Sequence, residues 1–352
     1  MIVRLPLPIA RSWGASLLIL LILLTGCRPS EDEPITETEL LLGTTISVTV
    51  YEPADEAVEA VFARVQEIEE KMSTTEEDYD TTELLQVNRG ADEAPVAVSE
   101  DTFSVIEAAM EYSEVTLGAF DLSIWPLVRL WGFGTADAQV PRVEAIEDAA
   151  SRVDYQKVRL YPADSSVSFE MEDMGIDVGG IAKGYAADEA RRILREHGVD
   201  RALLDFGGNI LTIGEKPDGS PWRIGVQGPD SHRGQFLGIV ETGPRAVVTS
   251  GDYERFFEVD GVRYHHLIDP STGYPAQNGL RSVTILAEDS IDADALSTAA
   301  FVLGVEDGAR LIESLPTVEG AFVTDDTVYL TSGMKINMID ESYKVIEVPG
   351  GS

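Results

Sequence analysis

Asp177-Val178-Gly179-Gly180-Ile181-Ala182-Lys183-Gly184-Tyr185 joins a short apolar run to a helical pattern that ends at Gly198. The two adjacent glycines have no Cβ, so the backbone there can approach a ligand closely. The first N–H groups of a helix have no partner within the helix and attract anions, and Lys183 adds a positive charge. The segment therefore predicts a phosphate-binding turn, although glycines placed there only for packing would give the same pattern.

Composition limits the class of protein. The chain has 352 residues, of which 44% are hydrophobic, as in globular proteins. At about 150 residues per domain, this length indicates two domains or one large one. The formal net charge is -36 and no long basic run occurs, so nucleic acid is not expected as a partner. The acidic residues are spread along the chain, which predicts a solvated surface rather than an acidic tail.

Hydrophobic periodicity predicts an α+β fold. Residues Thr44–Tyr51 alternate like a half-buried strand, and Ala57–Met72 has apolar residues at helical spacing. A late helix is expected over Asp292–Leu303, with Gly304 as its end. Strands and helices follow one another without steady βαβ alternation. We therefore expect a mostly antiparallel sheet with packed helices.

The N-terminus has the pattern of a bacterial lipoprotein signal. Arginines precede the apolar run Leu17–Leu24, which is too short for an ordinary membrane-spanning helix. It ends in Leu24-Thr25-Gly26-Cys27, which resembles a lipobox and predicts lipidation of Cys27. An uncleaved anchor helix with an incidental cysteine is the alternative. Because Cys27 is the sole cysteine, no intrachain disulfide is possible.

This pattern also predicts the domain organisation and the location. We expect a signal peptide over 1–26, a flexible tether over 27–39, the working domain over 40–340 and a tail over 341–352. The tether is polar and contains proline. The protein is then expected to be anchored by lipid to the cell membrane, on its periplasmic or extracellular face.

The expected late helix starts with a second chemical pattern. Asp294 and Thr298 are four residues apart, so both side chains lie on one face of a helix. A carboxylate and a hydroxyl are hard oxygen donors of the kind that bind Mg²⁺. Ser297, next to them, is a candidate cap or outer ligand. Capping alone is the other interpretation, because aspartate and serine are common at helix starts.

A third pattern places histidines beside a turn. His265 and His266 precede Asp269-Pro270-Ser271-Thr272-Gly273, which is strong turn chemistry. Side chains at such a loop often take part in catalysis. A zinc site is not favoured, because no third soft ligand accompanies the pair. A structural histidine beside a turn remains the alternative.

Six segments taken together resemble a known family. They are Gly118–Asp121, Leu130–Gly134, Asp177–Tyr185, Asp205–Asn209, His266–Gly273 and Asp294–Thr298, in that order. The pattern is similar to that of the ApbE family, the FAD:protein FMN transferases, which are often lipoproteins. The resemblance covers roughly Leu40 to Leu330. It implies an α+β, T-fold-related domain with its active site in a cleft between subdomains.

The resemblance also implies a reaction. Mg²⁺ and FAD bind, the diphosphate is cleaved, FMN is joined by a phosphoester to a threonine or serine hydroxyl of a target protein, and AMP leaves. Family targets are typically subunits of sodium-pumping NADH:quinone reductase or Rnf complexes. Two alternatives stay open: an Mg²⁺-dependent FAD pyrophosphatase that yields FMN and AMP, and a non-enzymatic FAD-binding lipoprotein.

Site residues follow from the family pattern. It implies a metal site made by Gly180, Asp294, Ser297 and Thr298. It implies FAD contacts from Leu42, Ala119, Phe120, Asp121, Asp177, Lys183 and Ile268. His266 is the expected base, since imidazole titrates near neutral pH, and Asp269 is the second candidate. Leu42 stands where relatives often have methionine, and Thr75 stands where they often have tyrosine. Tyr79 is a candidate to supply the missing aromatic ring.

Overall fold

The computed structural model describes residues 34–75, 81–229 and 234–349. The predicted signal peptide, Cys27 and Tyr79 lie outside these described residues. Within the described ranges, the search for an apolar helix of membrane-spanning length finds no candidate.

A nine-stranded sheet is the largest element of the described residues. Its strand order is β1 (Ile35–Leu41), β2 (Thr44–Val50), β6 (Ala202–Phe206), β7 (Asn209–Ile213), β10 (Ala246–Gly251), β13 (Ser282–Ala287), β14 (Glu319–Val323), β15 (Thr327–Leu330) and β17 (Lys344–Glu347). Only β15 and β17 pair in parallel; the other neighbours are antiparallel. The expected α+β class with a mostly antiparallel sheet is confirmed.

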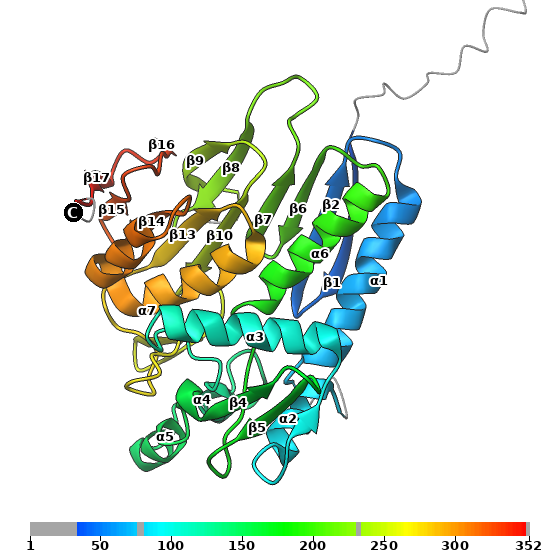
Figure 1. Cartoon of the computed structure of the whole chain (residues 1–352). Helices are drawn as coiled ribbons and strands as arrows, with labels where there is room; N and C mark the ends of the chain where they lie inside the picture. The colour runs from blue at the N-terminus through cyan, green and yellow to red at the C-terminus, as the bar shows by residue number, and fades with distance from the viewer. Residues whose placement is uncertain (1–33, 76–80, 230–233, 350–352) are drawn as a thin grey trace, which may run out of the picture. The chain divides into compact units, whose positions relative to one another are not determined.

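Helices cover one face of this sheet, as Figure 1 shows. They are α1 (Asp55–Met72), α6 (Ala182–Glu196) and α7 (Ser290–Ser314). Against the opposite face pack β8 (Trp222–Gln227) and β9 (Phe236–Thr242), which form a three-stranded sheet with β16 (Asn337–Met338). Because both of its faces are covered, every residue of the central strand β13 is buried.

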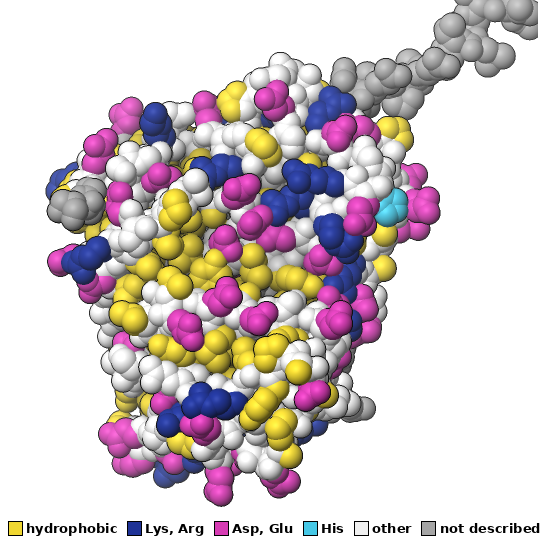
Figure 2. Space-filling view, viewed as in Figure 1, with side chains coloured by type: hydrophobic (Ala, Val, Ile, Leu, Met, Phe, Trp, Pro, Cys, Tyr) yellow, Lys and Arg dark blue, Asp and Glu magenta, His cyan; other side chains and the backbone are white. Residues whose placement is uncertain are grey.

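The remaining elements surround α3 (Glu100–Val115) and the loops that follow it (Figure 1). They are α2 (Glu83–Gly90), α4 (Trp125–Trp131), α5 (Val143–Ala150), the 3₁₀ helix η1 (Tyr155–Lys157), the sheet of β3 (Val96–Ala97), β5 (Ser166–Phe169) and β4 (Val158–Tyr161), and the hairpin of β11 (Phe256–Val259) and β12 (Val262–His265). Acidic side chains are scattered over the face in Figure 2, as expected for a solvated surface.

The structure corrects two boundaries. Strand β1 starts at Ile35, within the expected tether, because its backbone pairs with β2 along its whole length. Strand β17 lies within the expected tail and pairs with β15. The predicted end of the late helix at Gly304 is confirmed, since this residue has a non-helical φ of 80°, and a second helical segment then continues to Ser314. Asn278 donates a hydrogen bond to the carbonyl oxygen of Phe301 at 2.7 Å, which satisfies one carbonyl at this break.

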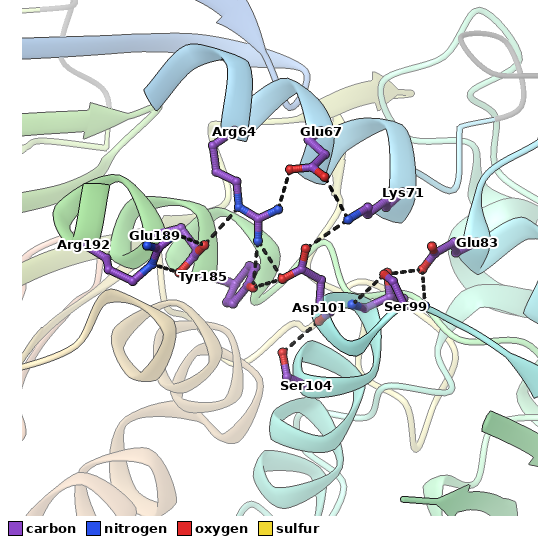
Figure 3. Close-up of polar contacts among 11 residues, drawn as sticks. Arg64, Glu67, Lys71, Glu83, Ser99, Asp101, Ser104, Tyr185, Glu189 and Arg192 are labelled. Atoms are coloured by element: carbon purple, nitrogen blue, oxygen red, sulfur yellow. Dashed lines mark hydrogen bonds and ion pairs between the residues drawn. The ribbon is translucent and has the colours of Figure 1, made fainter. Parts of the chain in front are cut away.

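An ion-pair network joins α1, α3 and α6 (Figure 3). Arg64 donates to Asp101 at 2.6 Å and to Glu189 at 2.9 Å, and Lys71 and Tyr185 also donate to Asp101. The Arg64 guanidinium holds the pKa of the Asp101 carboxyl well below its usual range. Asp101 therefore contributes stability above its unfolded pKa of about 3.9, and this contribution is lost as the pH falls through the lower folded value.

We expect Arg64→Met to lower the free energy of unfolding at pH 7 by about 1–3 kcal/mol, because it removes the main partner of Asp101 and one partner of Glu189, both partly buried carboxylates. Urea denaturation followed by circular dichroism measures this loss. Arg159→Met is the matched control, since Arg159 pairs with Glu170 on the surface and such pairs contribute about 0–1 kcal/mol. Equal losses in the two variants would contradict the assignment.

Candidate active site

Helices α6 and α7 pack unusually close at Gly184. A Cβ placed on Gly184 would lie 2.4 Å from the carbonyl oxygen of Ser290, nearer than any real side chain could come. The Gly184 N–H donates to Asp294 Oδ2 at 2.9 Å. The absence of a side chain at this position therefore allows the α6 segment and the α7 segment to meet.

This contact brings the predicted metal residues together. A Cβ placed on Gly180 would lie 3.5 Å from Thr298 Oγ1. Asp294 is only 3% exposed, and its Oδ1 lies 3.4 Å from the Lys183 ammonium. Ser297 is also buried, but its hydroxyl donates to the Asp294 carbonyl oxygen and lies 2.8 Å from Ser250 Oγ. Its hydroxyl is therefore engaged within the fold.

The oxygen atoms at this place fit a magnesium ion that shares its coordination with a substrate. Among the described residues, no group of three or more His, Cys, Asp or Glu side chains could hold a metal by itself. The protein would supply the Asp294 carboxylate, the Thr298 hydroxyl and the Gly180 carbonyl. Mg²⁺ usually keeps several waters and is bound by one or two carboxylates together with substrate phosphates. The donor set at this site matches that coordination preference.

Asp177 is held in place by its neighbours. Its Oδ2 accepts a hydrogen bond from Thr74 Oγ1 at 2.6 Å, and its Oδ1 accepts one from the Gly179 N–H at 2.8 Å. Lys183 lies in the first turn of α6, and its ammonium group donates to the Gly179 carbonyl oxygen. Asp177 and Lys183, two of the predicted FAD contacts, therefore lie on either side of the two glycines in the sequence.

The Ala119–Asp121 loop also lies next to Gly180. The Phe120 ring would come within 3.1 Å of a Cβ on Gly180, so the ring lies directly against the glycine. Asp121 is buried, and both of its oxygens accept hydrogen bonds, from Ser123 and from the Tyr155 N–H. Burial raises the pKa of Asp121. Its carboxylate shapes this loop.

His266 is oriented by the main chain. Its Nδ1 lies 3.2 Å from the Arg255 carbonyl oxygen. A carbonyl oxygen can only accept, so Nδ1 carries the proton and Nε2 keeps its lone pair. Burial lowers the pKa of His266 to about 3, and the positive charges of Arg255 and Lys183 act in the same direction. His266 is therefore neutral at physiological pH and lies within electrostatic reach of Lys183.

The Arg255 side chain joins His266 to the first hairpin. It donates to the Gly43 carbonyl oxygen at 3.4 Å, in the turn that connects β1 and β2. Leu42, in the same turn, has a φ of 52°. The left-handed backbone at Leu42 and Gly43 is the conformation that a two-residue hairpin turn requires. The predicted Leu42 position thus lies on the turn that Arg255 contacts.

The other predicted residues near His266 have structural partners. Asp269 Oδ1 accepts hydrogen bonds from the N–H and the hydroxyl of Ser271, which stabilise the predicted turn. Ile268 is buried against the Trp131 cluster. His265 is buried, and its Nε2 lies 3.0 Å from the Ala276 carbonyl oxygen, so it has a structural role.

Sequence reasoning missed several contributors to this site. Thr74 precedes Thr75, but nothing in the sequence links it to Asp177, 103 residues away. Ser250 lies in β10 and Arg255 in the bend before β11, and neither belongs to a local motif. The aromatic rings of Phe257 and Tyr264 pack on Trp131. The alternating sequence of their hairpin was the signal from which this packing could have been predicted.

One cavity of the described residues lies elsewhere. It has a volume of about 660 Å³ and is lined by residues of α2, α4 and α5, among them Asn88, Trp125 and Ala149. None of the predicted site residues lines this cavity. The candidate site is therefore defined by the contacts among the predicted site residues and not by this cavity.

Comparisons with known proteins agree on one family. A family model described as the ApbE family matches residues 42–322. The FAD:protein FMN transferase of Treponema pallidum is 38% identical over 309 residues, which cover 83% of this chain and 84% of that protein. In fold, the ApbE protein from Thermotoga maritima has a TM-score of 0.77 and 36% identity, covering 87% of this chain and 97% of its own. The flavin transferase ApbE from Vibrio cholerae has a TM-score of 0.75 and 30% identity, covering 85% and 97%.

Gly184→Ala is expected to destabilise the protein by about 1–3 kcal/mol, because the added methyl group collides with the Ser290 carbonyl oxygen. In a helix without such a contact, the same change would be stabilising. Urea denaturation measures the difference. Gly243→Ala serves as the control, since a Cβ there meets nothing within 4 Å. A neutral or stabilising effect at Gly184 would show that the two helices are not in this contact.

The His266 ring is expected to stay neutral between pH 5 and 8. With a folded pKa of about 3 and an unfolded value of about 6.5, its contribution to stability is complete above pH 6.5 and is lost progressively as the pH falls toward 3. Nitrogen NMR of the imidazole rings, assigned with His266→Gln, measures this. A His266 midpoint between pH 6 and 7 would contradict this lowered pKa.

Proposed function

This chain belongs to the ApbE family, and from that premise we propose that it transfers FMN from FAD to a threonine or serine hydroxyl of a target protein, in an Mg²⁺-dependent reaction that releases AMP. The relatives are named FAD:protein FMN transferases, so the chain is assigned as an enzyme of that kind. One observation carries the finer assignment: Gly180, Asp294 and Thr298 meet beside Lys183, and His266 lies within electrostatic reach of that lysine.

The metal residues would hold Mg²⁺ against the diphosphate of FAD. Asp294, Thr298 and the Gly180 carbonyl would supply oxygen ligands, and the bound ion would neutralise charge on the phosphoryl groups. Ser297 would support the Asp294 backbone rather than contact the ion, because its hydroxyl donates to the Asp294 carbonyl oxygen. Lys183 is paired with Asp294 here, and its flexible ammonium group would be able to reach the phosphates instead.

Other residues would position the dinucleotide. Asp177, fixed by Thr74, would accept a hydrogen bond from FAD. Phe120 would offer a ring face beside Gly180, and Ala119 and Asp121 would keep its loop in shape. Leu42 would offer an apolar contact from the β1–β2 turn, and Ile268 would support a ring from the Trp131 cluster.

His266 would act as the base. Its pKa of about 3 keeps Nε2 unprotonated at physiological pH but makes the ring a weaker base than the near-neutral imidazole that the sequence predicted. The target hydroxyl oxygen attacks the FMN phosphorus, its proton passes to His266 Nε2, and the bond from that phosphorus to the bridging oxygen breaks, so that AMP leaves with the electron pair. The main-chain contact with Arg255 holds the ring in the tautomer that can accept this proton. Asp269 is the weaker candidate, because one of its oxygens already accepts two hydrogen bonds in its own turn.

The location and the target protein are part of the proposal. The lipobox at Leu24–Cys27 supports lipid anchoring to the cell membrane with the catalytic domain on the periplasmic or extracellular side. An acceptor on that side of the membrane, such as an Rnf or sodium-pumping NADH:quinone reductase subunit, would fit this placement. The high negative charge supports the expectation that nucleic acid is not a partner.

The test is transfer of flavin to an acceptor protein. Full-length protein in detergent is incubated with FAD, Mg²⁺ and a candidate acceptor, and covalent flavin is detected by fluorescence after denaturing electrophoresis. We expect His266→Ala to lower the transfer rate by about 10²–10⁴-fold, the usual contribution of a general base. Asp294→Asn or removal of Mg²⁺ with EDTA should abolish transfer.

His197→Ala is the matched control, because His197 lies at the far end of α6 from Gly180 and its Nδ1 lies 2.9 Å from the Ile193 carbonyl oxygen of its own helix. This variant should transfer flavin at the wild-type rate. Release of FMN and AMP without labelled acceptor would instead indicate a pyrophosphatase. Binding of FAD without any cleavage would indicate a flavin-binding lipoprotein.

A further inference from the structure

Helices α6 and α7 meet in antiparallel order at intervals of one helical turn. Three pairs lie along this contact: Gly180 with Thr298, Gly184 with Asp294, and Asp188 with Ser290. Each step is four residues forward on the α6 side and four residues back on the α7 side. The first pair belongs to the proposed metal site, whereas the last lies about 11 Å away along the helix, two turns on.

The third pair supplies the missing cap of α7. A helix start leaves N–H groups without partners, and the residue before α7, Asp289, makes no side-chain cap. Asp188 provides it from the neighbouring helix. Its Oδ1 accepts from the Ser290 N–H at 3.0 Å, and its Oδ2 accepts from the Ile291 N–H at 2.9 Å. Both carboxylate oxygens are therefore used on the first turn of α7.

The second pair is the reciprocal contact. Asp294 of α7 accepts from the Gly184 N–H, in the first turn of α6, where the preceding residue Ile181 also provides no side-chain cap. Asp294 would be shared with a metal ion in the proposed function, and its contact with Gly184 would then be weakened. The Asp188 carboxylate would not be shared with the metal ion in this way, because it lies two turns from the proposed metal site.

We propose that Asp188 is a positioning residue that sets the register of α7 against α6, so that Asp294 and Thr298 face Gly180. The role rests on the proposed function for the identity of the metal site. Asp188 contacts neither the predicted ligands nor the expected substrate. Losing it would leave two partly buried N–H groups without this acceptor and let the start of α7 shift or fray, which would displace the predicted ligands one and two turns further on.

Two measurements on the full-length protein in detergent test this role. Mn²⁺ binding in the presence of FAD is followed by electron paramagnetic resonance, and amide hydrogen exchange of the Ser290–Ile291 segment is measured without metal. We expect Asp188→Ala to weaken Mn²⁺ binding by about 10–100-fold, as losses of supporting residues around metal ligands do. Exchange at the start of α7 should also become faster.

The control is Glu189→Gln, which removes the adjacent carboxylate from α6 and weakens the Arg64 network but leaves the α7 cap intact. It should lower stability without changing Mn²⁺ binding more than about twofold, well below the expected loss for the test variant. Asp188→Asn keeps one acceptor oxygen and should fall between wild type and Asp188→Ala. It also carries the test should the alanine variant not fold.

The outcomes separate the two proposals. Wild-type Mn²⁺ affinity in both Asp188 variants, or equal weakening in Glu189→Gln, would overturn the positioning role while leaving the transferase proposal in place. If the wild type itself bound no Mn²⁺ with FAD, the metal assignment would be wrong and the positioning role would fall with it.

Discussion

The close approach of α6 and α7 at Gly184 is the constraint on which the candidate site depends. Any side chain larger than a hydrogen atom there would overlap the Ser290 carbonyl oxygen. Because the two helices touch at this point, one loop that carries glycines and one helix that carries oxygen ligands face each other, although they are more than a hundred residues apart in sequence. Both helices pack against the same face of the large sheet.

Polar contacts then refine what this packing brings together. Thr74 fixes Asp177, Ser250 engages Ser297, and the Arg255 carbonyl oxygen sets the tautomer of His266. None of these three supporting groups is itself a predicted ligand or base. Each uses one hydrogen bond to remove a degree of freedom from a predicted site residue, which is how a site gains the fixed geometry that catalysis requires.

Much of the fold and site could be predicted because the signals are local. The helix after Gly180 and the Asp294–Thr298 spacing depend on neighbouring residues, and the structure shows both. The tether boundary was wrong because strand β1 is stabilised by pairing with β2, and its exposed, alternating polar residues resemble a linker. Helix α7 was predicted to stop at Gly304, and its helical backbone does break there, whereas the second segment up to Ser314 was not predicted. Asn278 supports this break from a distant loop. Contacts such as Thr74 with Asp177 have no local signature at all.

The edge hairpin gives the molecule a directional response to tension. Strand β1 follows directly after residue 34, and its first residue, Ile35, pairs with the last residue of β2, Val50. Tension on the N-terminal segment would thus act on the open end of the hairpin and peel the hydrogen bonds one pair at a time, instead of shearing them together. The peeling would run toward the Leu42–Gly43 turn that Arg255 holds beside His266. A mechanical load at the N-terminus would therefore reach the neighbourhood of His266 only after the rest of β1 had unzipped.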